Sequence, residues 1–309
     1  MGRLIEDITD CGFIGNTPLY RLKKIMPSGS GCVYVKLEDL NPGGSIKSRI
    51  AFQMIVDAEK QGLLRPYSGQ TIIEPTGGNT GAGLAMLGAM RGYKVILVMP
   101  DNYSKQKVNV LRAYGADVVL SDSKKGNDSH VQKVREIKKE NPEYVWLDQF
   151  TNLSNTKAHY DNTGREIIED LRKVDCFVAG IGSGGTISGV GKRIRENFPS
   201  AQIVGVQPEG CDVLNGKGIP HKIEGLAVGV PLRLLDVSLI TKMVTVKNEE
   251  AIFCSQQLSN REGLLVGISS GANVFAAMKM AEMLGPGKNV VTVAPDSGRN
   301  YLGTIVGCD

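Results

Sequence analysis

Apolar residues along the chain predict strands and helices in alternation. Residues 93–100 are apolar almost throughout, as expected for a strand of a parallel sheet that is buried on both faces. Residues 129–139 have the charged, amphipathic pattern of a helix, and residues 105–114 are also expected to be helical. Further strands are predicted at 32–37, 70–75, 117–120, 144–147, 175–180, 202–207, 243–246 and 289–294, and further helices at 82–87, 163–173, 189–197, 249–260 and 272–284.

This alternation predicts an α/β protein built from open, mostly parallel sheets with helices on both faces. A length of 309 residues suits two such domains, or one large α/β unit. Ligands of these folds bind outside the carboxyl ends of the strands. Several glycine-rich loops follow predicted strands directly, so these loops are the first places to look for a site.

Composition and charge narrow the class of partner. Hydrophobic residues make up 41% of the chain and charged residues 22%, which is ordinary for a soluble globular protein. The net charge of +4 is spread along the chain, which argues against a nucleic-acid or membrane partner and suits small anionic ligands. Six cysteines without CxxC pairing and three histidines give no metal-ligand spacing. Without a signal-peptide pattern or an apolar span, the cytoplasm is the expected compartment.

Lys47 lies in the segment Asn41-Pro-Gly-Gly-Ser-Ile-Lys-Ser-Arg49, between a Pro/Gly loop and the apolar-periodic residues 50–55. The loop predicts a helix start at this point. Backbone N–H groups and the positive end of a helix dipole disfavour a charge on the lysine amine there. A neutral lysine can form a Schiff base, although a solvated charge is the commoner explanation for one lysine taken alone.

The loop Gly180-Ile-Gly-Ser-Gly-Gly-Thr186 follows a predicted strand and precedes a helix. Its backbone N–H groups, with the hydroxyls of Ser183 and Thr186, can hold a phosphate at the helix N-terminus. The loop also contains a GxGxxG pattern, so a dinucleotide is an alternative ligand. The acidic residue for a ribose would have to be Glu209, which lies beyond Pro208 and weakens that alternative. Tight packing explains only one or two of the glycines.

Two further loops add to this picture. The amides and two threonine hydroxyls of Thr76-Gly-Gly-Asn-Thr80 could hold a carboxylate, or the segment could be a glycine-rich helix cap. In Gly267-Ile-Ser-Ser-Gly-Ala272, Ser269 or Ser270 could be a simple N-cap. Taken together, a Schiff-base lysine, a phosphate loop, a carboxylate loop and a serine at a helix start are what pyridoxal phosphate and an amino acid require.

These motifs make the chain resemble the cysteine synthase and cystathionine β-synthase family of fold-type II pyridoxal-phosphate enzymes. The resemblance runs nearly end to end, over Ile14-Gly-Asn-Thr-Pro-Leu19, residues 36–47, residues 74–81, His159-Tyr160 with Thr163-Gly164, residues 182–186, residues 267–271 and Pro295-Asp-Ser297. It implies two domains with the cofactor in the cleft between them. An N-terminal, mobile domain of residues 1–12 and 37–150 would carry the substrate loop. A C-terminal domain of residues 13–36 and 151–309 would bind the cofactor phosphate. The family also implies a homodimer.

The resemblance assigns a role to each motif residue. Lys47 would form the Schiff base with pyridoxal 5′-phosphate and later move the Cα proton. Asn79 would bind the 3′ oxygen of the cofactor, and Ser269 would face its pyridine nitrogen. The cofactor phosphate would be bound by Gly182, Ser183, Gly184, Gly185 and Thr186. The substrate would be bound by Thr76, Gly77, Gly78, Thr80, Gln149 and Gly225.

The implied reaction is β-replacement on serine or an O-activated serine through an aminoacrylate, with a thiol, sulfide or amine as nucleophile. Its product would be cysteine or a cysteine-like thioether amino acid. β-Elimination of cysteine to hydrogen sulfide, lanthionine formation and an amine-nucleophile variant giving a diaminopropionate-type product are alternatives. From other classes, a catalytically silent binding protein and a nicotinamide-dependent dehydrogenase are the competing hypotheses.

The chain departs from the family pattern at three places near these motifs. Ser48 replaces the usual aspartate after the lysine, which predicts a change in a local cap. Gly77 replaces a serine of the substrate loop, which removes a hydroxyl and loosens the backbone. Residues 151–155 replace the usual sequence after Gln149 and Phe150. Glu224 and residues 295–302 favour the cystathionine β-synthase branch.

Overall fold

The computed structural model describes residues 13–76, 78–126, 128–229 and 231–307. The chain divides into two compact units, which we call the first unit (residues 1–14 and 41–155) and the second unit (residues 15–40 and 156–309). The predicted contribution of residues 1–12 to a domain lies outside the described residues, and so does Gly77. Within the described residues, no helix is long and apolar enough to cross a membrane.

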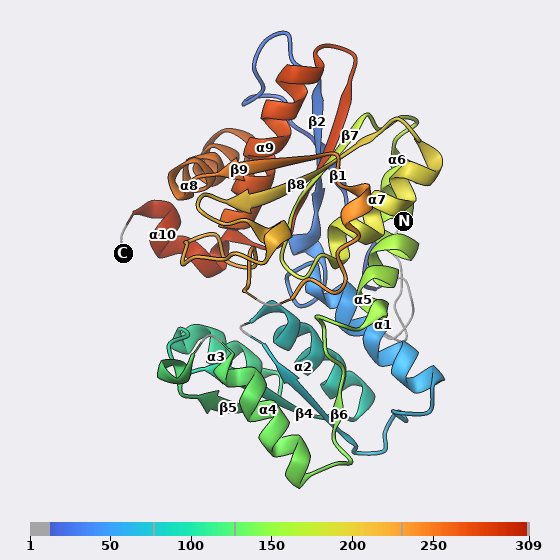
Figure 1. The fold of residues 1–309 in the computed structure, drawn as a ribbon, viewed down its shortest axis with the longest axis vertical. Coiled ribbons are helices and arrows are strands. Elements are labelled where there is room, and N and C mark those ends of the chain that lie inside the picture. The colour runs from blue at the N-terminus through green and yellow to red at the C-terminus, as the bar shows by residue number, and fades with distance from the viewer. Residues whose placement is uncertain (1–12, 77, 127, 230, 308–309) are drawn as a thin grey trace. The chain divides into compact units, whose positions relative to one another are not determined.

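The first unit contains a four-stranded sheet in the order β5-β4-β3-β6, in which all neighbouring strands are parallel. Its strands are β3 (Thr71–Pro75), β4 (Lys94–Pro100), β5 (Asp117–Ser121) and β6 (Val145–Trp146). Its helices are α1 (Lys47–Lys60), α2 (Asn79–Arg91), α3 (Lys105–Ala113) and α4 (Ser129–Glu140) (Figure 1). On one face, Val134 of α4 is buried against Ile73 of β3 and Val98 of β4.

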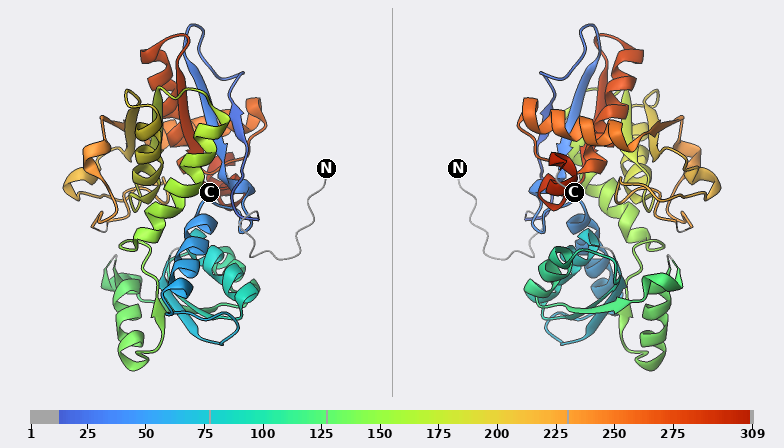
Figure 2. Two further views of the ribbon diagram at one scale, coloured as in Figure 1. Left: turned by 90° about the vertical axis from the view of Figure 1, so that its right-hand side faces the viewer. Right: turned by 90° about the vertical axis from the view of Figure 1, so that its left-hand side faces the viewer.

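The second unit contains a six-stranded sheet in the order β1-β2-β10-β7-β8-β9. Its strands are β1 (Leu19–Arg21), β2 (Cys32–Leu37), β7 (Cys176–Gly180), β8 (Gln202–Pro208), β9 (Lys242–Val246) and β10 (Asn289–Ala294), and only β1 is antiparallel to its neighbour. Its helices are α6 (Arg165–Asp170), α7 (Gly185–Asn197), α8 (Asn248–Gln257), α9 (Ile268–Leu284) and α10 (Leu302–Val306), while α5 (Leu153–Ala158) runs across the boundary of the two units. Figure 2 shows both sheets and their helices from two further sides.

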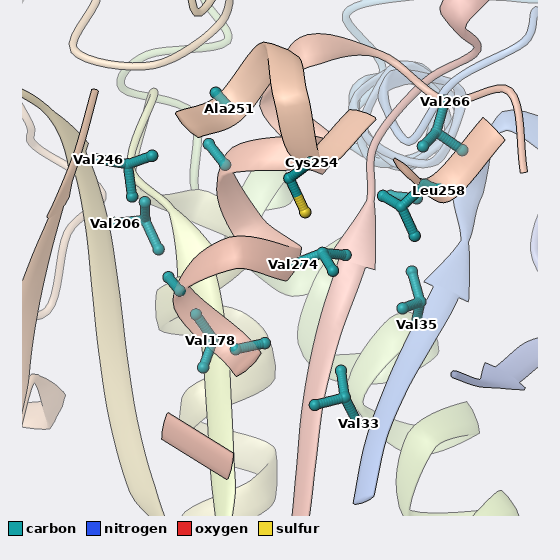
Figure 3. Close-up of a cluster of buried hydrophobic side chains, with 14 of the residues drawn as sticks. Val33, Val35, Val178, Val206, Val246, Ala251, Cys254, Leu258, Val266 and Val274 are labelled. Atoms are coloured by element: carbon teal, nitrogen blue, oxygen red, sulfur yellow. The ribbon is translucent and has the colours of Figure 1, made fainter. Parts of the chain in front are cut away.

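Successive residues of the strands in the second unit supply two separate cores. Val178 of β7 points to the face covered by α8 and α9, where it joins Val206 and Val274 (Figure 3). Phe177, its neighbour in sequence, points to the face covered by α7 and packs with Val190. A strand with apolar residues on both faces is the expected pattern for a covered parallel sheet. The predicted α/β class with two mostly parallel sheets is therefore confirmed.

The structure differs from the predicted elements mainly at helix starts. Helices α2, α7 and α9 begin at Asn79, Gly185 and Ile268, three to four residues before the apolar patterns suggested. Glycine carries no hydrophobic signal, so periodicity detects a helix only after its glycine-rich first turn. The helix predicted at 163–173 is shorter, because Leu171 is extended, and a π-helical turn over His159–Gly164 precedes it.

Candidate active site

Lys47 is the first residue of α1 and is half-buried. Its backbone N–H donates to the Ser45 hydroxyl over 3.2 Å. The hydroxyl of the buried Ser48 donates to the carbonyl of Pro42 and so folds the preceding loop back onto the first turn of the helix. At Gly43, with φ +81°, an added Cβ would lie 2.8 Å from the Ser48 hydroxyl. Ser48, which departs from the family pattern, therefore fixes the loop that presents Lys47.

In the first unit, the loop after β3 brings the predicted carboxylate ligands together. Thr76 and Thr80 are both buried, and the backbone N–H of Gly78 donates to the Thr76 hydroxyl over 3.3 Å. The Thr80 hydroxyl donates to Oε1 of Gln149 over 2.6 Å, although the two residues are 69 positions apart. Asn79 is the first residue of α2, between the two threonines. Thr80 and Gln149 thus form one polar pair.

Glu74 lies just before this loop, and no role was predicted for it from the sequence. Its side chain is fully buried and accepts the backbone N–H groups of Asp148 and Gln149. Burial raises the pKa of Glu74 to about 8 from its ordinary value of 4.5, although those N–H groups lower it. The sequence could have drawn attention to Glu74, because it is the single carboxylate in the otherwise apolar residues 72–75.

In the second unit, the predicted phosphate loop forms the N-terminus of α7. Gly184 is the N-cap residue, with φ +89°, and makes no side-chain cap hydrogen bond. The N–H of Gly185, in the first turn, donates to the Ser183 hydroxyl over 3.4 Å. The N-cap residue itself has no side chain that could fill the helix start, which suits an anion site. An added Cβ on Gly182 would lie 2.2 Å from the carbonyl oxygen of Gly225. Gly225, predicted from the substrate motif, thus packs directly against the phosphate loop.

The Thr186 hydroxyl, at the end of the loop, lies 3.2 Å from Nε2 of His159. The other ring nitrogen of His159 lies 3.1 Å from the Thr163 hydroxyl, and the histidine is completely buried. His159 and Thr163 belong to the π-helical turn, which packs against α7. Both residues belong to the motifs of the family resemblance, but no role was predicted for either. The structure shows that they support the hydroxyl of a predicted phosphate ligand.

Ser269 lies in the first turn of α9, is buried, and follows the N-cap Gly267, which makes no side-chain cap bond. Its neighbour Ser270 is completely buried, and its hydroxyl finds no hydrogen-bond partner among the described residues. One turn later, Asn273 accepts the backbone N–H of Gly180 over 2.8 Å. The same helix therefore carries Ser269 and is tied to the strand end that begins the phosphate loop.

Each unit by itself fits one part of pyridoxal phosphate and its amino-acid substrate. The second unit offers an uncapped helix start with closely packed glycines for a phosphate and a serine hydroxyl for a ring nitrogen. The first unit offers a lysine and a polar pair for a carboxylate. The acidic residue that a dinucleotide would need, Glu209, is exposed beyond the end of β8, with its carboxylate 3.9 Å from Lys247. The geometry thus fits pyridoxal phosphate better than a dinucleotide.

Comparison with known proteins agrees with this fit. A family model for pyridoxal-phosphate-dependent enzymes matches residues 11–296. Cysteine synthase of Staphylococcus aureus (strain Mu50 / ATCC 700699) is 42% identical over 303 residues, covering 97% of this chain and 96% of that protein. The crystal structure of an O-ureido-L-serine synthase matches with a TM-score of 0.94 and 38% identity, covering 99% of this chain and 97% of the other. O-Acetylserine-dependent cystathionine β-synthase from Helicobacter pylori matches with a TM-score of 0.90 and 35% identity, covering 98% of each chain.

The similarities to these three relatives extend over nearly the whole of both chains in each comparison. They confirm the expected cofactor, pyridoxal 5′-phosphate, and the expected reaction class, β-replacement. The chain belongs to the pyridoxal-phosphate-dependent enzymes, within the cysteine synthase and cystathionine β-synthase group.

Proposed function

We propose that this enzyme replaces the β-substituent of an O-activated serine, or of serine itself, with a sulfide or thiol to give cysteine or a thioether amino acid. The observation that carries the proposal is the pairing of Thr80 with Gln149 in the unit that also presents Lys47. This pair supplies neutral polar groups for an amino-acid carboxylate close to a helix start. The name of the Helicobacter pylori relative, an O-acetylserine-dependent cystathionine β-synthase, supports an O-substituted serine as the substrate class.

The residues of the second unit would hold and tune the cofactor. The N–H groups at the start of α7, with the hydroxyls of Ser183 and Thr186, would bind its phosphate, and His159 would orient the Thr186 hydroxyl. Ser269 would place a neutral hydroxyl at the pyridine nitrogen, which leaves that nitrogen largely unprotonated. Bound pyridoxal phosphate supplies an electron sink for charge at the substrate Cα. A sink weakened in this way favours loss of a β-leaving group over racemisation or transamination.

Residues of the first unit would bind the substrate and move its protons. Thr76, Thr80 and Gln149 would hold the carboxylate, and Asn79 would contact the 3′ oxygen of the cofactor. The amine of Lys47 would attach the cofactor between turnovers and, once displaced by the substrate amine, take the proton from Cα. The bond from Cβ to the leaving group then breaks, and the leaving group departs with its electron pair. A sulfur–Cβ bond forms with the nucleophile, and Lys47 returns the proton to Cα.

We also expect a homodimer in a reducing cytoplasm. The family resemblance supports the dimer. The four cysteines of the described residues, Cys32, Cys176, Cys211 and Cys254, are all thiols, as is usual in a reducing compartment. Light scattering on the purified protein would measure a mass of twice 33.2 kDa for a dimer, and a single-chain mass would contradict this expectation.

A visible absorption titration tests the proposed reaction. The purified protein would be titrated separately with O-acetylserine, O-phosphoserine, serine and cysteine, and each mixture would then receive sulfide or homocysteine. We expect the cofactor band to shift with at least one of the first three compounds and to return when the nucleophile is added, with formation of a cysteine-type product. A cofactor band that none of the four compounds changes would refute the substrate class.

A further inference from the structure

Gln149 has no regular secondary structure to hold it, because β6 ends at Trp146 and α5 begins only at Leu153. Nevertheless its side chain is buried and reaches Thr80 Oγ1 over 2.6 Å. An amide on an irregular segment needs some other support to keep one orientation. The support comes from two buried side chains that contact the backbone of Gln149 on both sides.

Glu74 provides the first contact. One of its carboxyl oxygens accepts the backbone N–H of Gln149 over 2.9 Å, and the other accepts the backbone N–H of Asp148 over 2.9 Å. Both oxygens are thus used on consecutive peptide groups. Glu74 is fully buried at the end of β3, a rigid strand between β4 and β6, so its carboxyl group is a fixed point for the loop.

Asn155 provides the second contact. Its side-chain amide donates to the carbonyl oxygen of Gln149 over 2.7 Å, and only 1% of the residue is exposed. Together, Glu74 holds the N–H and Asn155 holds the carbonyl of the same residue. A residue whose two backbone groups are both bound can rotate only about its side-chain bonds, and Thr80 and the carbonyl of Pro75 then bind the side-chain amide of Gln149.

The backbone conformation of Asp148, the residue before Gln149, is further evidence that tertiary contacts hold this segment in place. Asp148 has φ +54°, a left-handed conformation that non-glycine residues rarely adopt. Such a conformation persists only where the surroundings determine it. The surroundings here are Glu74, which accepts the Asp148 N–H, and Thr151, whose hydroxyl donates to the Asp148 carboxylate over 2.5 Å.

We propose that Glu74 and Asn155 are positioning residues for the substrate carboxylate, acting through the backbone of Gln149. This inference rests on the proposed function, because it assumes that Gln149 and Thr80 bind that carboxylate. It adds two residues that make no contact with the substrate themselves. Thr151 and Asn155, which make these contacts, lie at the two ends of the segment 151–155 that follows Gln149 and Phe150.

The test compares the binding of an amino acid with that of its methyl ester, which lacks the carboxylate charge. Dissociation constants for O-acetylserine and its methyl ester are measured from the shift of the cofactor band in the wild type, Glu74→Gln and Asn155→Ala. Glutamine keeps the shape of Glu74, but its amide nitrogen cannot accept an N–H, so one backbone contact is lost. We expect each variant to bind the amino acid about 10-fold more weakly, as for one lost buried hydrogen bond, and the ester nearly unchanged.

Two matched controls belong to the same unit. Glu59→Gln removes a carboxylate that accepts from Arg91 and Tyr93, and Asn141→Ala removes an amide that donates to Ile137 at the end of α4. Neither of these hydrogen bonds involves a residue of the segment 147–155. Both controls should leave the ratio of the two dissociation constants at the wild-type value.

A second measurement does not depend on the substrate. Hydrogen exchange of a peptide covering residues 147–150 should be faster in Glu74→Gln and Asn155→Ala than in the controls. Unchanged exchange together with an unchanged ratio of dissociation constants would overturn the inference. If a variant bound the amino acid and its ester more weakly by the same factor, the inference would also be overturned, because a general structural defect weakens both equally. A wild-type protein that responds to no amino acid would instead refute the proposed function, and the inference with it.

Discussion

Gly182 is the position where a single methyl group should most clearly disturb cofactor binding. The Cβ of an alanine there would lie 2.2 Å from the backbone carbonyl oxygen of Gly225, whereas real Cβ atoms essentially never come closer than 3.0 Å to such an atom. The obstacle is backbone, so no side-chain rotation can relieve it. Either the phosphate loop or the segment around Gly225 has to move by about an ångström, and overpacking of this kind costs about 1–3 kcal/mol.

The same displacement would misplace the N–H groups at the start of α7. If the whole overpacking free energy destabilises the cofactor-bound state, the affinity for the cofactor falls by about 5- to 150-fold. We would remove the cofactor, titrate pyridoxal phosphate back into wild type and Gly182→Ala, and follow the visible band. Gly191→Ala is the control, because Gly191 lies within α7, the helix that follows the phosphate loop, and the three atoms nearest to its added Cβ belong to the Ile203 side chain, the nearest at 3.1 Å. Cofactor affinity of Gly182→Ala within twofold of the wild type would refute the reasoning.

Three other changes test the remaining parts of the site. Lys47→Ala should abolish turnover and the cofactor band that depends on the lysine, and turnover at the wild-type rate in a kinetic assay would contradict its role. Thr80→Val removes the donor to Gln149 and should raise KM for the amino acid about 3- to 10-fold while leaving cofactor occupancy unchanged. Because burial raises the pKa of Glu74 to about 8, the folded protein holds this proton more tightly than the unfolded chain. The wild-type free energy of unfolding should therefore fall, relative to Glu74→Gln, by up to about 1.4 kcal/mol per pH unit as the pH rises from 4.5 to 8. Urea unfolding of both proteins across that range measures the difference, and parallel curves would contradict the assignment.

The sequence predicts the strands well because a buried parallel strand is a mostly apolar run. The run of residues 32–37 matches β2, and residues 289–294 match β10, at both ends. Helix starts at the site are missed for a physical reason: their first turns are rich in glycine, serine and threonine, which carry little hydrophobic pattern. The short β1 was not predicted, since three residues carry too little pattern.

The site residues also fall into those that local motifs indicate and those that the sequence alone does not indicate. Motifs indicated Lys47, the Thr76–Thr80 loop and the phosphate loop, because ligand-binding groups cluster locally in such motifs. The supporting contacts join distant positions, such as Glu74 with Gln149 and His159 with Thr186. A single sequence shows that these residues are present but not that the fold brings them together. The three-dimensional structure is needed to show which buried polar groups hold the predicted ligand-binding side chains in place.

The attachment of the cofactor to Lys47 is the central claim, and it can be measured directly. Borohydride reduction of the purified enzyme makes the bond between the cofactor's aldehyde carbon and a lysine amine permanent, and peptide mass spectrometry then locates it. We predict the mass of the reduced cofactor on the peptide that contains Lys47, and nowhere else. Modification of a different lysine, or no modification in protein that retains its visible colour, would contradict the account.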